Sequence, residues 1–307
     1  MEMKDYEKDC ERVLKTADSI FYNKNKEMKL ALCAMLSGRH LLLEDVPGVG
    51  KTTLAYFLSH IFGLDLSRIQ CTNDLLPSDI IGTMIFKKSI EDFEFKKGPL
   101  FGDIILADEL NRASPKTQSA FLQAMEEKCI NIDRVEFGLS SNFLIIATQN
   151  PVEQVGTFPL PESQLDRFFM SLSLGFPSRE FERKILKSNS IREEIKKISP
   201  VFNSKECLEL RLRVEKVEYT EDLLDYVLDI ISYGRNELEN GYALSPRSGK
   251  DLLKAAKACA FLSQRSFVTP EDIRFVLPGV LSHRLGGKRG RGYGLEQSQK
   301  VLDAVSV

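Results

Sequence analysis

The sequence predicts an α/β fold for the first part of the chain and an all-helical region after it. An apolar run at residues 41–43 leads into a glycine-bearing loop and then a helical pattern, which gives the order strand, loop, helix. Two further apolar runs, at residues 104–107 and 143–147, each end in polar residues, as buried strands do. Beyond Gly175 the recurring pattern is helical.

Length and composition restrict the class of protein. The chain has 307 residues, 43% of them hydrophobic, which suffices for two packed domains of ~150 residues. The formal net charge is −2, so no overall basic field favours nucleic acid as a partner. Six cysteines are scattered with no pair at metal-ligand spacing, and three histidines lie far from other ligands. We expect buried thiols in a reducing compartment and no metal centre held by side chains alone.

The N-terminus and the hydropathy pattern bear on localisation. The first ten residues are charged where a secretory signal would be apolar, and no run of ~18 apolar residues occurs. The sequence therefore predicts a cytoplasmic protein without a transmembrane segment.

The first elements are two helices and a strand. Helical spacing of apolar residues extends over residues 5–37 and is interrupted at the polar residues 23–26, which predicts two joined helices. Ser37 and Gly38 end the second helix, and a strand is expected at residues 40–44.

The loop after this strand has the residue types of a phosphate-binding loop. Glycines let backbone N–H groups turn onto phosphate oxygens, Lys51 reaches the β- and γ-phosphates of ATP, and the Thr52 hydroxyl is offered to Mg²⁺. The N-terminal dipole of the following helix favours the same anion. The predicted contacts with the nucleotide in this loop are Pro47, Gly48, Val49, Gly50, Lys51, Thr52 and Thr53.

Asp45 departs from the usual pattern of such a loop. The pattern G-x-x-x-x-G-K-[ST] begins with glycine, and Asp45 stands at that position. Because Gly48, Gly50, Lys51 and Thr52 remain, we interpret Asp45 as a tolerated entry residue and leave its consequence open.

Two adjacent carboxylates close the strand at residues 104–107. Asp108 is expected to hold Mg²⁺ directly or through water, and Glu109 to orient and polarise the attacking water. Two surface acids closing any strand would be the structural alternative. The phosphate loop ~55 residues upstream favours the catalytic interpretation.

Between these motifs the sequence predicts a helix at residues 53–62, a strand at residues 68–72, and a short helix at residues 74–82 that carries an inserted hairpin. This insertion is either a binding loop or a surface excursion. A helix from Ser114-Pro115 and a small hairpin at residues 130–137 follow the acidic pair.

The next strand ends at a third polar position. Asn150 follows the apolar run at residues 143–147, where ligands bind in sheets of this type, and it is expected to contact the γ-phosphate or the attacking water. Arg167 lies just before a strand at residues 170–174. Its own phosphate site is out of reach on this interpretation, so Arg167 is expected to serve a neighbouring subunit.

The turn at residues 175–178 is the predicted domain boundary, which divides the chain into residues 1–176 and 177–307. Helices are expected at residues 179–188, 204–214, 220–238, 245–262 and 269–277. Arg247 falls in the first turn of its helix, where the dipole repels a cation, so it is either a functional arginine or a solvated surface residue. Residues 284–292 are basic and glycine-rich, and we expect a flexible solvated segment, with a nucleic-acid or acidic-partner contact as the alternative.

With these motifs in place, the chain resembles the MoxR family of AAA+ ATPases over nearly its whole length. The stretches that carry the resemblance are RIQCTNDLLPSDIIG, GPLFGDIILADELNRASPKTQSAFLQAMEE, IIATQNPVEQVGTFPLPESQLDRFFM, SPRSGKDLLKAAKA and VTPEDI. The resemblance implies an AAA+ P-loop core, a parallel sheet sandwiched by helices, followed by an all-helical lid. It also implies a homo-oligomeric ring, commonly a hexamer, with ATP between subunits.

The resemblance implies a role for each matching residue. Lys51 and Thr52 would be Walker A, Asp108 and Glu109 Walker B, Asn150 sensor 1, Arg167 the arginine finger acting in trans, and Arg247 sensor 2 from the lid. Residues 74–82 with their hairpin resemble the helix-2 insert and residues 130–137 the hairpin before sensor 1, both facing the pore or a client. Arg112 would contact the neighbouring subunit. Family members resemble chaperones that mature or activate client complexes, often with a partner bearing a von Willebrand factor A domain.

Four functions compete at this stage. An ATP-driven remodelling chaperone leads, and a nucleic-acid motor is the main alternative, opposed by the net charge and supported by the basic segment at residues 284–292. A small-molecule kinase is disfavoured because Glu109, Asn150 and a trans arginine suit attack by water. A nucleotide-gated scaffold without turnover is disfavoured by the intact Glu109.

Overall fold

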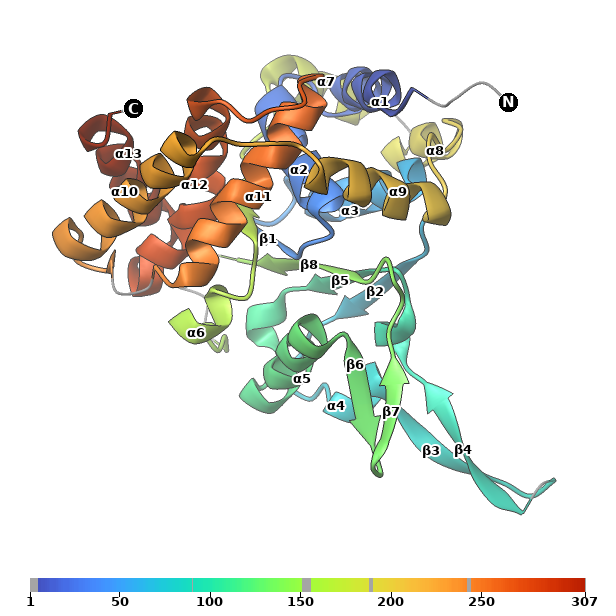
Figure 1. The fold of residues 1–307 in the computed structure, drawn as a ribbon. Helices are drawn as coiled ribbons and strands as arrows, with labels where there is room; N and C mark the ends of the chain where they lie inside the picture. The colour runs from blue at the N-terminus through green and yellow to red at the C-terminus, as the bar shows by residue number, and fades with distance from the viewer. Residues whose placement is uncertain (1–4, 90, 151–155, 188–189, 242–243, 307) are drawn as a thin grey trace.

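A parallel five-stranded sheet lies at the centre of the first part of the chain in the computed structural model, which describes residues 5–89, 91–150, 156–187, 190–241 and 244–306 (Figure 1). The strands are β1 (Leu41–Glu44), β2 (Leu66–Gln70), β5 (Ile104–Asp108), β8 (Leu144–Gln149) and β9 (Met170–Leu172), in the order β2-β5-β8-β1-β9. All neighbouring strands in it pair in parallel, so the carboxyl ends of all five meet at one edge. The predicted α/β core is confirmed, and β2 begins two residues earlier than expected.

Both faces of the sheet are covered because the strands are apolar on both sides. On one face Leu41 and Leu43 pack in the core that α1 (Tyr6–Ile20), α2 (Asn25–Ser37) and α3 (Lys51–Ile61) cover. On the other face Leu42 packs in a second core with α5 (Pro115–Glu127). The two expected N-terminal helices are therefore confirmed, and helices cover both faces of the sheet.

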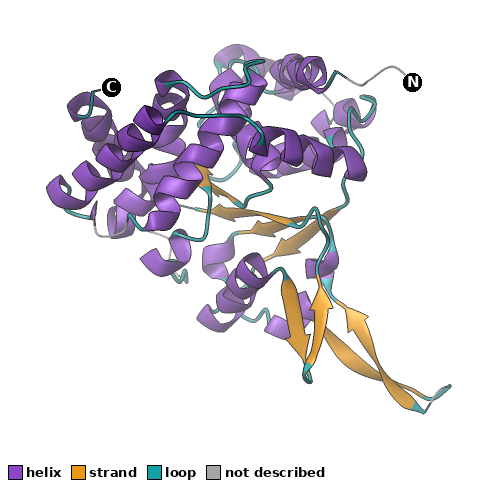
Figure 2. Ribbon diagram, viewed as in Figure 1, coloured by secondary structure: helices purple, strands orange, loops and turns teal. Residues whose placement is uncertain are grey.

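Two antiparallel hairpins project from the core, away from the C-terminal helices (Figures 1 and 2). The first, β3 (Gly82–Lys87) and β4 (Asp92–Lys97), follows the short helix α4 (Pro77–Ile81), and the second comprises β6 (Cys129–Ile132) and β7 (Val135–Gly138). The rings of Phe95 and Phe137 join them, with centroids 4.5 Å apart. Both predicted hairpins are confirmed.

The rest of the chain is helical after β9. Its helices are α7 (Arg179–Lys187), α8 (Ile191–Lys196), α9 (Ser204–Glu215), α10 (Glu221–Glu237), α11 (Pro246–Leu262), α12 (Pro270–Gly286) and α13 (Gly290–Ala304). The expected end of the first helix, Ser188, lies outside the described residues. The sequence did not predict α8, which packs on α3, while α9 packs on α2. None of the described helices is long and apolar enough to cross a membrane.

The prediction of a flexible basic segment at residues 284–292 is wrong. Helix α12 continues past the internal Pro278 to Gly286, and the 3₁₀ turn η4 (Gly287–Arg289) connects it to α13. The side chain of Arg284 is fully buried. Glycine serves close helix packing here, since a Cβ on Gly294 would lie 1.7 Å from the carbonyl oxygen of Ser282.

The contacts of Arg284 explain why a prediction from the composition of residues 284–292 was wrong. Arg284 forms ion pairs with Asp166 at 2.8 Å and Asp251 at 2.6 Å, so its charge is neutralised inside the fold. Arg289 pairs with Glu239 at 2.8 Å. A segment that is folded, with Arg284 and Arg289 paired to acidic residues, gives weaker support to the nucleic-acid motor that it favoured in the sequence.

Candidate functional site

A cavity of about 370 Å³ opens at the carboxyl edge of the sheet, beside the predicted phosphate loop. It is lined by Pro47, Gly48, Gly50, Lys51, Thr52, Thr53, Arg68, Gln70, Asp108, Glu109 and Asn150. The structure thus brings together the predicted loop, the acidic pair and the strand-end amide. Val49 is the exception in the loop, because it packs against the hydrophobic core.

The backbone of the phosphate loop explains its glycines. Gly48 and Gly50 have φ angles of +86° and +99°, a region that side chains disfavour. A Cβ would meet no atom within 4 Å at either position, so the dihedral angle and not the space requires glycine. Helix α3 begins at Lys51, and its first N–H groups point at this loop.

Lys51 is a buried cation in this cavity, with 7% of its surface exposed. Its Nζ donates to the carbonyl oxygens of Asp45 at 2.5 Å and Val46 at 3.3 Å, and to Asn150 Oδ1 at 3.0 Å. Burial lowers the pKa of Lys51, against the opposing pull of nearby carboxylates. A desolvated ammonium bound to neutral acceptors is well suited to anionic phosphate.

The Asp45 side chain forms hydrogen bonds that the pattern of the phosphate loop did not predict. Its φ angle is not left-handed, so glycine is not required there. Its Oδ1 accepts from Val46 N at 3.0 Å, while Oδ2 accepts from Ser173 Oγ at 3.0 Å and Gly175 N at 2.7 Å. Asp45 therefore ties the phosphate loop to the segment that leaves β9.

Asp108 presents its carboxylate at the cavity. Oδ1 accepts from Thr148 Oγ1 at 2.8 Å, and Oδ2 accepts from Arg68 Nη2 at 2.7 Å and Nε at 3.2 Å. Together with the Thr52 hydroxyl, this carboxylate gives the oxygen donors that Mg²⁺ prefers. In the described part of the chain no cluster of three His, Cys, Asp or Glu side chains could hold a metal. The donor set fits Mg²⁺ carried on nucleotide phosphates and water.

Glu109 adopts a left-handed conformation, with φ +57° and ψ 49°, directly after β5. Such a conformation is uncommon outside glycine and is often found at functional sites. Its Oε1 accepts from Asn150 Nδ2 at 2.9 Å, and its Oε2 lies 3.3 Å from Gln70 Nε2 and 3.2 Å from Arg112 Nη1. Arg112, expected at a subunit contact, thus pairs with the acid of its own chain.

The sequence prediction missed three residues that contact the acidic pair: Arg68, Gln70 and Thr148. The register of the sheet brings two of them there, since Gln70 lies opposite Asp108 and Arg68 opposite Leu106. Arg68 and Gln70 are polar residues within the predicted strand at residues 68–72, and Thr148 directly follows the apolar run at residues 143–147, so these polar positions were the available signal.

Arg167 and Arg247 do not line this cavity; the structure brings them to each other. Arg167 Nη1 donates to the Leu122 carbonyl oxygen at 3.1 Å and contacts the Glu126 carboxylate, which also lies 3.3 Å from Arg247 Nη2. The surrounding pocket of about 120 Å³ also includes the cations Arg39 and Lys128. Two arginines assigned separate roles therefore form one basic cluster.

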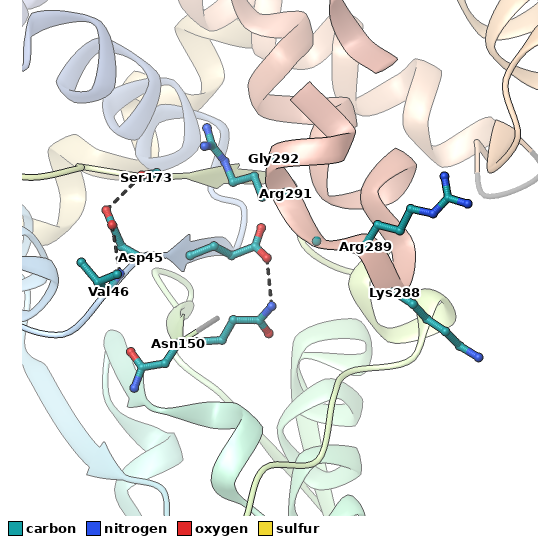
Figure 3. Close-up of a pocket in the computed structure, with 11 residues that line it drawn as sticks. Asp45, Val46, Asn150, Ser173, Lys288, Arg289, Arg291 and Gly292 are labelled. Atoms are coloured by element: carbon teal, nitrogen blue, oxygen red, sulfur yellow. Dashed lines mark hydrogen bonds between the residues drawn. The ribbon is translucent and has the colours of Figure 1, made fainter. Parts of the chain in front are cut away.

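A second cavity, of about 630 Å³, adjoins the phosphate loop through Asp45, Val46 and Asn150 (Figure 3). Residues 288–292 form its opposite wall. Between them Glu44 Oε1 accepts from Gln149 Nε2 at 2.9 Å, and burial raises the pKa of Glu44. The segment predicted to be flexible is thus a wall beside the functional edge.

A phosphate loop, an acidic pair and a strand-end amide that meet at one edge of a parallel sheet define an AAA+ P-loop nucleotide-binding protein. Residues 40–170 match the family model described as ATPase family associated with various cellular activities, and residues 233–304 match the AAA lid domain. The chain is 36% identical to "Chaperone MoxR1" of Mycobacterium tuberculosis over 90% of this chain and 75% of that protein. It belongs to the MoxR family of AAA+ ATPases.

A further relative and a solved structure support the same family assignment. The chain is 43% identical to the uncharacterized protein YeaC of Bacillus subtilis over 83% of this chain and 80% of the relative. The crystal structure of a "putative ATPase" from Cytophaga hutchinsonii superposes with a TM-score of 0.83 at 35% identity, and the match covers 98% of this chain and 95% of that one. The parallel core and the helical lid region are therefore shared with that structure.

Proposed function

We propose that this protein hydrolyses ATP to ADP and phosphate in the presence of Mg²⁺, and that turnover drives remodelling, maturation or activation of client protein complexes. The observation that carries the proposal is the continuous contact from Lys51 to Asn150 to Glu109. These contacts bring a cation, a strand-end amide and a carboxylate together in one cavity, which supports roles for them in positioning water against the γ-phosphate.

The proposed mechanism assigns each step to a group that lines the cavity. Backbone N–H groups of Gly48 and Gly50 and the Lys51 ammonium bind the phosphates. Thr52 and Asp108 would hold Mg²⁺, Asp108 directly or through water, and the bound ion would neutralise charge on the phosphates. Glu109 orients the attacking water and accepts its proton, and Asn150 holds that carboxylate in place.

We further propose that the active assembly is a homo-oligomeric ring, a hexamer, in which Arg167 and Arg247 act on the neighbour's nucleotide. Support comes from their position outside their own phosphate cavity, together in a cluster with Arg39 and Lys128. Arg247 was expected to approach the nucleotide of its own subunit from the lid. Its contact with Glu126 favours action in trans beside Arg167.

We also propose that the chain divides into a core at residues 1–176 and a lid at residues 177–307. The client surface in this proposal is the pair of hairpins on the core. Ile85, Phe86, Phe93 and Val135 are exposed apolar side chains on these hairpins. Such a cluster is typical of a protein-binding surface. The name of the relative MoxR1 supports a chaperone role, and we propose a cytoplasmic location and a partner with a von Willebrand factor A domain.

Steady-state ATP hydrolysis against protein concentration tests the proposal. The ATP turnover per subunit of the wild type should rise with protein concentration. Arg167→Ala and Lys51→Ala should each lose this turnover, and the loss for Arg167→Ala should be about 10³-fold. An equal mixture of the two variants should recover part of the activity, because one supplies the arginine and the other the phosphate loop. Concentration-independent turnover that survives Arg167→Ala would reject the shared site.

Glu109→Gln separates binding from chemistry in the same assay. This variant should bind ATP as the wild type does and lose turnover by about 10²–10⁴-fold, because the amide cannot accept the proton of water. Unchanged turnover in this variant would remove Glu109 from the reaction. Absence of turnover in the wild type would favour the nucleotide-gated scaffold instead.

A further inference from the structure

Arg68 lies inside the phosphate cavity, although neither the loop pattern nor the acidic pair assigns it a role. It comes from β2, at the side of the cavity opposite the phosphate loop, and half of its side chain is exposed. Its guanidinium donates twice to a single atom, Asp108 Oδ2, at 2.7 Å from Nη2 and 3.2 Å from Nε. This is a charge-assisted contact with the carboxylate expected to hold Mg²⁺.

The remaining contacts of Asp108 engage both of its carboxylate oxygens. Oδ1 accepts from Thr148 Oγ1, which lies on the neighbouring strand β8, at 2.8 Å. Oδ2 is covered by Arg68. A cation that binds Oδ2 directly competes with the guanidinium for this oxygen, and the two cations repel each other at such a distance.

Arg68 is also connected to the proposed catalytic base. Its Nη2 donates to Gln70 Oε1 at 3.0 Å, and Gln70 Nε2 donates to Glu109 Oε2 at 3.3 Å. The side chain of Gln70 therefore bridges the guanidinium and the carboxylate of Glu109. When Arg68 moves, Gln70 loses the acceptor contact that orients it.

We propose that Arg68 is a positioning residue that neutralises Asp108 while the site holds no metal, and that Mg²⁺ bound with ATP displaces it. The proposal rests on the proposed function, because it presumes that the cavity binds ATP with Mg²⁺. It makes Arg68 the side chain that exchanges with the metal at Asp108.

The test compares the affinity for a non-hydrolysable ATP analogue in excess Mg²⁺ and in EDTA, for the wild type and Arg68→Gln. Without Mg²⁺ the variant leaves Asp108 uncompensated beside the phosphates, so binding should weaken. With Mg²⁺ no guanidinium has to leave, so binding should be as tight or tighter. The dissociation constant in EDTA divided by that in Mg²⁺ should therefore be about tenfold or more higher for Arg68→Gln than for the wild type.

Arg12→Gln is the matched control, because it removes the same charge from an exposed site on α1. Its ratio should equal that of the wild type. An Arg68 that binds phosphate directly would give a different result, since Arg68→Gln would weaken binding equally with and without Mg²⁺. An unchanged or smaller ratio would overturn the inference while leaving ATP binding itself intact.

Thermal unfolding without nucleotide gives a readout independent of binding. Arg68→Gln should unfold at a lower temperature than the wild type in EDTA, and added Mg²⁺ should raise its midpoint more than that of the wild type. Equal responses to Mg²⁺ would also contradict the inference. A wild type that binds no analogue under either condition would overturn the proposed function itself, which distinguishes the two failures.

Discussion

Arg167 and Arg247 contact the same carboxylate, that of Glu126, although one precedes β9 and the other lies in the first turn of α11. The helix dipole disfavours a cation at this position of α11. Glu126, near the end of α5, supplies the compensating charge. The unusual placement of Arg247 in the sequence therefore has a structural reason, which is a shared acid that pairs the two arginines.

Glu126→Gln should lower ATP turnover about tenfold, in the range expected for mispositioned charge stabilisation. Two neighbouring guanidinium groups repel without the acid, so the pair should lose the alignment towards a neighbour's γ-phosphate that we propose for it. ATP affinity of the isolated subunit should not change, because Glu126 lies outside the phosphate cavity. Turnover and nucleotide binding, measured side by side, check both parts.

Glu127→Gln is the control, because this neighbouring acid is exposed and contacts Gln123 at 3.0 Å. It should retain wild-type turnover. If Glu126→Gln raised turnover instead, Glu126 would be a competitor of the phosphate for the arginines and not a residue that positions them.

Asp45→Ala should destabilise the fold by about 2 kcal/mol, since three hydrogen bonds to a carboxylate are lost. The loop would separate from Ser173 and Gly175, where the chain leaves β9. Urea unfolding measures the change, and Asp45→Asn should show a smaller loss because it keeps acceptor oxygen. Equal stability of Asp45→Ala and the wild type would mean that these contacts contribute nothing.

Acidic pH should destabilise the protein through its buried histidines. Burial lowers the pKa of His40 to about 3, and the pKa of His283 also falls well below its usual value because of burial. His40 Nδ1 accepts from Ile145 N at 3.0 Å, and its Nε2 faces the Met125 carbonyl oxygen at 3.3 Å. These contacts favour the neutral ring with its proton on Nε2.

The pKa of each histidine is lower in the folded state than its unfolded value of about 6.5. The contribution of the neutral histidine to the free energy of unfolding is therefore fully present above pH 6.5 and is lost as the pH falls below it. Each such histidine should cost about 1.4 kcal/mol of unfolding free energy at pH 5.5. Urea unfolding at pH 7.5 and 5.5 measures the loss, and NMR of the imidazole rings follows protonation in the folded state. A His40 ring that titrates near pH 6.5 would contradict the prediction.

The sequence by itself determined the elements whose signals are local. Leu41 to Thr53 contains a buried strand, two glycines that take positive φ angles and a helix start, and each is set by neighbouring residues. The same holds for the acidic pair and for Asn150, because parallel strands place their carboxyl ends at one edge.

Only the tertiary structure decided which distant residues meet. Arg68 reaches Asp108 through strand register, and Glu126 pairs two arginines from separate elements. Residues 284–292 resembled a solvated tail because composition reports charge and glycine content but not partners. Asp166 and Asp251 neutralise Arg284 within the fold, and Gly294 lets α13 pack closely on α12. Such pairings depend on long-range packing, which no local pattern encodes.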